Sequence, residues 1–154
     1  IDDLDVILRQ AYLQPVQFLR IESRYLRARS ALAMAAVNTG AGRFVSVARA
    51  EARRIAKEDM PWSNPIALVV QAGAAFLEGR TSQALKHLHD AAGQFERADM
   101  RFHAAATRRR IGALQDDSAG RECQQQADEW MARQQIKNPA GMTRMLTPGF
   151  PDVT

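Results

Sequence analysis

The stretch from Pro65 to Ala91 constrains the fold more than any other part of the chain. Residues 66–77 are apolar on nearly every side, which is typical of a central, buried helix. Asn64 can cap this helix through its side-chain oxygen, and Pro65 suits the first helical position because it lacks an N–H. Gly79 supplies a stop, since glycine enters a left-handed cap without strain. With a return helix after the stop, the stretch predicts two short antiparallel helices.

The return helix carries small and apolar residues at a spacing that recurs along the chain. Ala84, Leu88 and Ala91 have counterparts thirty-six residues earlier and thirty-six residues later. Small side chains at such positions let two helices approach closely, so the flanking segments read as diverged copies of the central hairpin. The matching positions are Ala48, Ala52 and Ile55 before it, and Gly120, Gln124 and Ala127 after it.

This repetition resembles a known family. A period near 34 residues built from helical hairpins resembles the tetratricopeptide repeat, which implies an all-α fold of about seven to eight helices. Its antiparallel hairpins would stack as a right-handed superhelix over residues 1–138, and residues 139–154 would form a short helix and a tail packed on it. The family's Trp-Leu-Gly-Tyr signature is absent, and Gln124 stands where a large apolar residue is usual. The alternative is an irregular helical bundle whose spacing repeats by chance.

Local signals predict helices on both sides of the central hairpin. A first helix carries a stripe of Leu4, Ile7, Leu8 and Leu13, and Pro15 breaks it. Asp116, Asp117 and Ser118 resemble a helix cap, and Asn138-Pro139 repeats the Asn-Pro start seen before the central helix. The other predicted helices cover Val16–Val37, Arg43–Glu58, Met100–Leu114 and Ala119–Gln135, with a short one after Asn138-Pro139.

The helix over Val16–Val37 combines a predicted core face with a row of arginines. Its expected core residues are Phe18, Leu19, Tyr25, Leu26, Leu32 and Met34. We interpret the arginine row as a solvated face with Glu22 as a local partner, although a phosphate-binding stripe is the alternative. That row consists of Arg20, Arg24, Arg27 and Arg29. Arg108-Arg109-Arg110 is the densest charge cluster and is likewise expected to lie on a solvated outer face, with contact to an acidic partner as the alternative.

The composition of the chain favours a single helical domain and argues against nucleic-acid binding and a membrane span. The chain has 154 residues and 46% apolar content, which suits one all-helical domain. Its net charge is +4, but residues 1–75 hold 10 basic and 7 acidic residues, and residues 76–154 hold 11 and 10, so neither half forms a nucleic-acid-binding arm. No apolar run reaches the roughly eighteen residues that span a bilayer.

A single cysteine fits a reducing cytoplasm. Because the chain begins at Ile1 rather than Met, we expect a fragment of a longer protein.

No pattern predicts catalysis, a metal site or a cofactor. On a helix, His87 and His89 point about 200° apart and cannot share a metal, and His103 with Cys123 does not complete a ligand set by spacing. There is no nucleophile motif, phosphate-binding glycine loop or paired-carboxylate arrangement. We therefore expect a protein that is not an enzyme.

The leading helices offer a candidate partner-binding groove. In a tetratricopeptide stack their inner face lines the concave side, and here the repeat places apolar residues on it. Large apolar side chains gain about 1.5–3 kcal/mol each from burial, so we expect a cover over this face. Candidate covers are the C-terminal tail, the long first helices, a second copy or an apolar partner helix, and we favour the tail or a neighbouring segment. The predicted groove residues are Ile66, Val69, Phe76, Leu77, Phe102 and Arg109.

The end of the chain resembles the C-terminal region of large bacterial multidomain signalling proteins, in which a serine/threonine kinase domain or an AAA/STAND-type ATPase precedes helical repeats. The matching residues are Trp130, Met131, Gln135, Ile136, Asn138, Pro139, Met142, Leu146, Pro148, Gly149 and Phe150. The resemblance implies a regulatory, protein-binding region that contacts a partner protein, a second copy or other domains of the same parent chain. The alternative is the small-molecule-sensing helical domain of an ATP-dependent transcriptional activator, with its pocket near Phe76 and Phe102.

Overall fold

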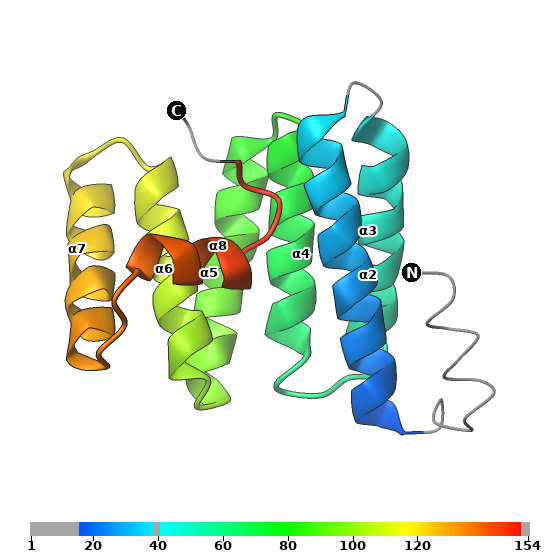
Figure 1. Ribbon diagram of the computed structural model, residues 1–154, viewed down its shortest axis with the longest axis horizontal. Helices are drawn as coiled ribbons and strands as arrows, with labels where there is room; N and C mark the ends of the chain where they lie inside the picture. Colours follow the sequence, from blue (N-terminus) through cyan, green and yellow to red (C-terminus); the bar gives the residue numbers. More distant parts are fainter. Residues whose placement is uncertain (1–15, 39–40, 152–154) are drawn as a thin grey trace.

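The computed structural model describes residues 16–38 and 41–151, which form seven α-helices and no strand (Figure 1). The all-α prediction is therefore confirmed over these ranges. The predicted first helix and the break at Pro15 lie outside the described residues. The helices are α2 (Gln17–Val37), α3 (Ala41–Ala56), α4 (Asn64–Leu77), α5 (Thr81–Arg97), α6 (Arg101–Leu114), α7 (Ser118–Arg133) and α8 (Pro139–Leu146).

Consecutive helices pack as antiparallel hairpins. The most extensive contacts join α2 to α3, α4 to α5, and α6 to α7, and further contacts join each hairpin to the next. The short helix α8 lies across α6 and also touches α7 (Figure 1). The predicted hairpin arrangement is thus confirmed. Nothing in the structure tests the division into units of 1–138 and 139–154, which stays a prediction.

The repeated small residues form the helix interfaces. In the first two hairpins all six positions, from Ala48 to Ala91, are fully buried. In the third hairpin Gly120 and Ala127 are buried, and Gln124 is half-buried. A Cβ atom added to Gly112 would lie 2.5 Å from the carbonyl oxygen of Gly120, so α6 and α7 meet at backbone distance. The spacing in the sequence therefore marks where neighbouring helices come closest.

Most helix ends follow the local signals. Gly79 has a φ of +75° after α4, and the Asp117 carboxylate accepts a hydrogen bond from the Gly120 amide at 2.7 Å, as a cap should. Asn138 caps α8 in the same way. The prediction for Asn64 is wrong: α4 begins at Asn64 itself, whose side-chain amide donates to Asp59 Oδ1 at 3.2 Å. The helices predicted outside the central hairpin begin and end within two residues of the observed bounds.

One face of α2 is more exposed than predicted. Phe18, Leu26 and Met34 are 57%, 48% and 45% exposed, so their assignment to the core is wrong. The reason is that α2 packs on α3 and α4 from one side only, and no described helix covers the other side. Tyr25 and Leu32, which face α3 and α4, are buried as predicted.

Three arginines of α2, namely Arg20, Arg24 and Arg27, pair with acidic residues in or just after α3, whereas the charge of Arg29 acts on Glu22 as predicted. Arg20 donates two hydrogen bonds to the Glu58 carboxylate at 2.6 and 2.7 Å, and Arg24 lies 2.5 Å from the same group. Arg27 lies 3.8 Å from Glu51, which is itself buried in α3. The Arg20 hydrogen bonds, helped by the Arg24 charge, lower the pKa of Glu58 to about 2. This cluster ties the start of α2 to the end of α3.

Glu58→Gln is expected to lower the free energy of unfolding at pH 7 by about 1–2 kcal/mol, because the charged pair with Arg20 is lost. The folded-state pKa lies below the ordinary value of 4.5, so the stabilisation is complete above pH 4.5 and disappears as the pH falls toward 2. Urea unfolding at pH 7, 4 and 3 measures this loss. Glu129→Gln, at an exposed position on α7, should change stability by less than about 0.5 kcal/mol. Equal pH profiles for the two variants would contradict the role of Glu58.

Candidate functional site

The C-terminal tail crosses the side of the molecule formed by α2, α4 and α6. After α8 the chain turns back and runs along α4 (Figure 1). A Cβ atom on Gly73 of α4 would overlap the carbonyl oxygen of Pro148, and one on Gly149 would lie 2.9 Å from Gly73 Cα. Gly149 also has a φ of +88°. The two glycines let the tail lie directly on the helix backbone.

Phe150 anchors the tail in the core. Its side chain is 5% exposed and joins the apolar cluster formed by α4, α5 and α6. The Phe76 ring lies 5.0 Å from the Phe150 ring, tilted by 41°, and the Arg110 guanidinium lies 5.0 Å from the centre of the Phe150 ring. Aromatic pairs and cation–π contacts of this kind add to the gain from burial.

Arg110 overturns part of the prediction for the arginine cluster. It is only 8% exposed, and its Nε atom donates to Thr147 Oγ1 at 3.2 Å, so a solvated outer face is wrong for this residue. The Thr147 hydroxyl in turn donates to the Thr143 carbonyl at 2.7 Å. Arg108 is exposed and pairs with Glu96 of α5, while Arg109 pairs with Asp128 of α7 at 2.6 Å. Arg110 therefore links α6 to the tail.

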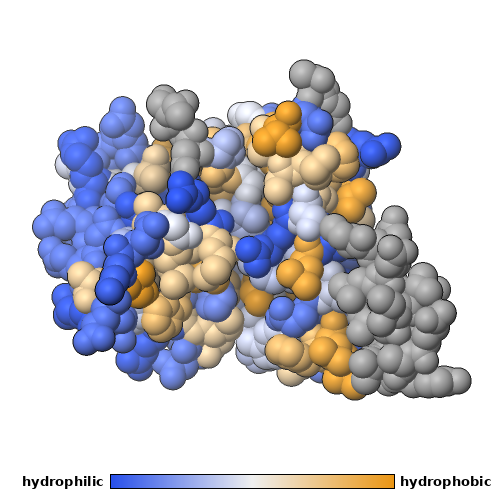
Figure 2. All heavy atoms as spheres, viewed as in Figure 1, coloured by the Kyte–Doolittle hydropathy of each residue, from blue (hydrophilic) through white to orange (hydrophobic). Residues whose placement is uncertain are grey.

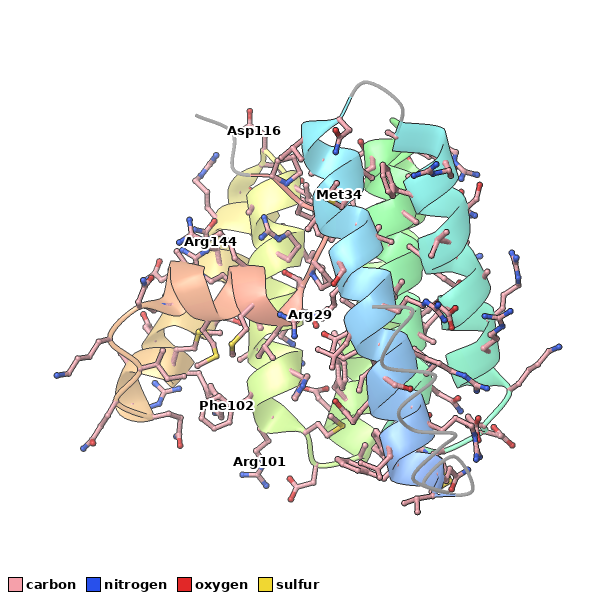
Figure 3. The ribbon with its side chains drawn as sticks, turned by 45° about the vertical axis from the view of Figure 1, so that its right-hand side comes forward. Arg29, Met34, Arg101, Phe102, Asp116 and Arg144 are labelled. Carbon is pink, nitrogen blue, oxygen red and sulfur yellow. The ribbon has the colours of Figure 1, made fainter. Side chains whose placement is uncertain are left out.

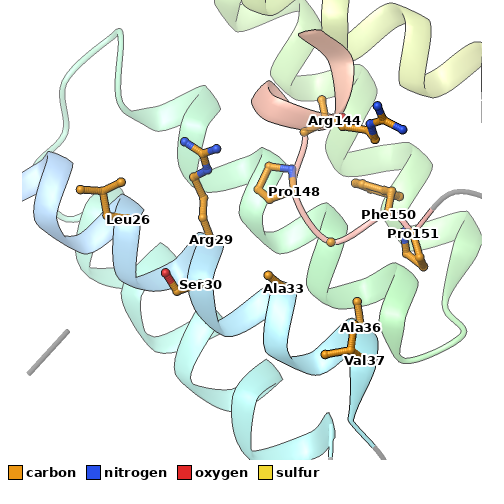
Figure 4. A pocket seen from close by; sticks show the side chains of 12 residues that line it. Leu26, Arg29, Ser30, Ala33, Ala36, Val37, Arg144, Pro148, Phe150 and Pro151 are labelled. Carbon is orange, nitrogen blue, oxygen red and sulfur yellow. The ribbon is translucent and has the colours of Figure 1, made fainter. Parts of the chain in front are cut away.

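Two cavities flank the tail. The larger, of about 640 Å³, separates it from α2 and is lined by Leu26, Arg29 and Val37, with Arg144 at its α8 edge (Figure 4). The smaller, of about 370 Å³, lies on the α6 side and is bounded by the rings of Phe76 and Phe150 together with Arg109, Arg110 and Arg144. Together they form a groove, which we call the tail groove, with residues 147–151 running through it.

The predicted groove residues do not share one surface. Ile66 and Val69 are buried in the core between α2 and α5, at 5% and 1% exposure, and Leu77 is half-buried against the same core. Phe76 and Arg109 are brought together at the smaller cavity of the tail groove. Phe102 lies at the start of α6, away from Arg29 and Met34 (Figure 3), and its ring meets Trp130 edge-on at 5.4 Å.

Sequence reasoning missed Arg29, Arg110, Arg144 and Thr147 as groove residues. A signal for Arg110 was present: it lies three positions after Thr107 and four after Ala106, and both of these are buried in α6. Residues at these spacings share one face of a helix. The positions of Arg29 and Arg144 depend on how the tail folds back, and no local pattern gives that.

Two titratable side chains outside the tail groove, His103 and Cys123, contact neighbouring helices. Within residues 16–38 and 41–151, no three histidine, cysteine or acidic side chains lie close enough to hold a metal ion. His103 packs on Phe95 with ring centres 5.1 Å apart, and burial lowers the pKa of its imidazole. Burial raises the pKa of the Cys123 thiol, which donates to the Arg108 carbonyl at 3.4 Å. Burial therefore favours the protonated thiol over the thiolate.

The surface around α7 differs from that around the tail groove. Hydrophilic residues cover α7, whereas apolar and mixed residues lie over the tail and α2 (Figure 2). A third cavity, of about 470 Å³, is lined by residues of α6 and α7 that include Arg101, Glu129 and Trp130. Because acidic and basic residues both line this cavity, its charge does not indicate whether a ligand would be an anion or a cation.

Gly73→Ala is expected to expel the tail from α4, because the added Cβ would overlap the Pro148 carbonyl oxygen. Helix content should be unchanged, since alanine favours a helix over glycine by up to about 1 kcal/mol. Binding of a hydrophobic dye should rise as Phe76 and Phe150 become exposed. The control is Gly93→Ala in α5, whose Cβ would meet only Arg97 Nη1 at an ordinary 3.6 Å. Equal dye binding by the two variants would show that the tail does not rest on Gly73.

Comparison with known proteins gives no relative. No protein-family model, no curated protein and no solved structure matches the chain. In the described part of the chain, no helix is both long and apolar enough to span a bilayer.

Proposed function

We propose that this chain is a non-catalytic protein-interaction domain whose binding surface is the tail groove. Its helical hairpins would continue the tetratricopeptide-like pattern into a right-handed superhelix, and the domain would serve as a regulatory C-terminal region of a cytoplasmic bacterial signalling protein. The partner would be another protein, another domain of the same parent chain or a second copy.

One observation carries this proposal. The groove holds a short chain segment, residues 147–151, which turns as it crosses α4 and is held by backbone contact at Gly73 and a ring contact at Phe76. A surface that accommodates one short chain segment has the shape and apolar lining needed to accommodate another. The absence of any metal-binding cluster among the described residues leaves the groove as the feature with most binding potential.

A small-molecule sensor is the second candidate. The cavity of about 370 Å³ beside Phe76 favours it, because it combines aromatic rings with Arg109 and Arg110 and could take a small anionic effector. Phe102, which was expected to share this pocket, lies elsewhere and pairs with Trp130. The pocket would thus be built from α4, α6 and the tail alone.

Site-specific photo-crosslinking in cells separates the two candidates. A benzophenone amino acid at Val37, which is 79% exposed beside the tail groove, should give protein adducts that the same probe at exposed His89 on α5 does not give. Mass spectrometry identifies the adducts, and mixing the purified proteins must reproduce them. No reproducible adduct at Val37, together with thermal-shift hits from a single class of metabolites, would favour the sensor and contradict the interaction domain.

A further inference from the structure

The contacts between the tail and the tail groove indicate which residue types a bound peptide needs. Gly149 and Gly73 approach at backbone distance, so the bound segment needs a glycine, in a positive-φ conformation, where it crosses α4. Any other residue there would be strained and would also collide with the helix. At this point the groove therefore accepts only a residue that has no side chain.

The next residue of the bound segment fills an aromatic pocket. Phe150 inserts between the Phe76 ring and the Arg110 guanidinium, each 5.0 Å away, and is almost completely buried. A planar ring suits both neighbours, because it can pack on another ring and present its π face to a cation. An aliphatic side chain would keep only the apolar contact. The pocket thus selects an aromatic residue directly after the glycine.

The charged side chains that line the groove are arginines, one of which, Arg109, also pairs with Asp128 of α7 at 2.6 Å. Arg29, Arg109, Arg110 and Arg144 line its two cavities, and arginine is the only charged residue type among the described residues of the lining. Arg29 lies on the α2 side and Arg144 on α8, so positive charge flanks the path of the bound segment (Figure 4). Guanidinium groups in this arrangement attract carboxylates and suit bidentate pairing with them.

We propose, on the basis of the proposed function, that the tail groove binds a short acidic peptide of a partner protein in which an aromatic residue follows a glycine. The chain's own tail has this chemistry, with Gly149-Phe150 followed by Asp152 in the sequence. The tail therefore occupies the groove in cis, and a partner peptide must displace it. Only molecules whose tail has left the groove can bind the partner peptide. The apparent affinity of the intact chain is therefore reduced in proportion to the fraction of molecules with an open groove.

Fluorescence anisotropy with a labelled synthetic peptide tests this inference. The probe has the sequence of residues 146–154, and the protein is the full chain carrying Phe150→Ala, which empties the aromatic pocket. The variant should bind the probe at least tenfold more tightly than the wild type does. A probe with F150A should lose at least tenfold in affinity. A probe with D152K should lose several-fold at low salt, with a smaller loss at high salt.

Two further variants of the chain complete the test. Thr147→Ala removes the hydroxyl that accepts from Arg110, so it loosens the tail more mildly and replaces Phe150→Ala if that variant fails to fold. Gly73→Ala should not bind the probe, because its Cβ blocks the path of any segment across α4. The inference is overturned if folded Phe150→Ala or Thr147→Ala protein does not bind the probe, or binds the F150A probe equally well. If adducts at Val37 persist in that case, the proposed function stands without this peptide chemistry.

Discussion

Phe150→Ala is expected to lower the free energy of unfolding by about 3 kcal/mol, because it removes a buried ring from the cluster that joins α4, α5 and α6. The loss includes the contacts with Phe76 and Arg110, whose guanidinium would then border a void. Urea unfolding followed by circular dichroism measures the change. Hydrophobic dye binding should rise together with the loss of stability.

The control for this substitution is Phe102→Ala, the same chemical change at a position that is 42% exposed. It loses only an edge contact with Trp130, so the cost should be about 1 kcal/mol. If the two variants lose equal stability, Phe150 does not anchor the tail. Removing residues 138–154 altogether should reproduce the increase in dye binding and lower the melting temperature.

Gly112→Ala is expected to destabilise the protein by about 2–3 kcal/mol, although alanine is the better helix former. The added Cβ would lie 2.5 Å from the Gly120 carbonyl oxygen and 2.8 Å from Gln124 Cβ, so α6 and α7 would have to separate. The backbone oxygen cannot move aside as a flexible side chain could. Thermal unfolding measures the loss.

Gly93→Ala again provides the comparison, because its Cβ enters a space with ordinary contacts. That variant should be more stable than the wild type by about 0.5–1 kcal/mol. If Gly112→Ala were stabilised to the same extent, the close approach of α6 and α7 would be wrong. The opposite signs expected for the two variants separate helix propensity from helix packing.

The hairpin architecture could be read from the sequence because its signals are local or periodic. Gly79 ends α4 and Asp117 starts α7 through backbone preferences that act within a few residues. The recurring small and apolar residues, such as Ala52 and Leu88, identify the buried faces because such side chains fit between closely packed helices. These features do not depend on knowing which distant segments meet.

The tail groove could be predicted only in part, since it depends on contacts between distant segments. The apolar face near Phe76 indicated that a cover was needed, and the tail was a candidate for it. The burial of Arg110 was missed because a run of three arginines suggested solvent, while its partners Thr147 and Phe150 lie about forty residues away. The exposure of Leu26 was missed because a helical stripe shows apolar residues but not whether a neighbour covers them.

Nuclear Overhauser spectroscopy of the full chain tests most directly whether the tail occupies the groove. The structure predicts cross-peaks between the α protons of Gly73 and Gly149, and between the rings of Phe76 and Phe150. Adding an acidic peptide with a glycine–aromatic pair should weaken these cross-peaks while leaving those between α4 and α5 intact. A tail with random-coil chemical shifts and no cross-peaks to Gly73 or Phe76 would contradict the account.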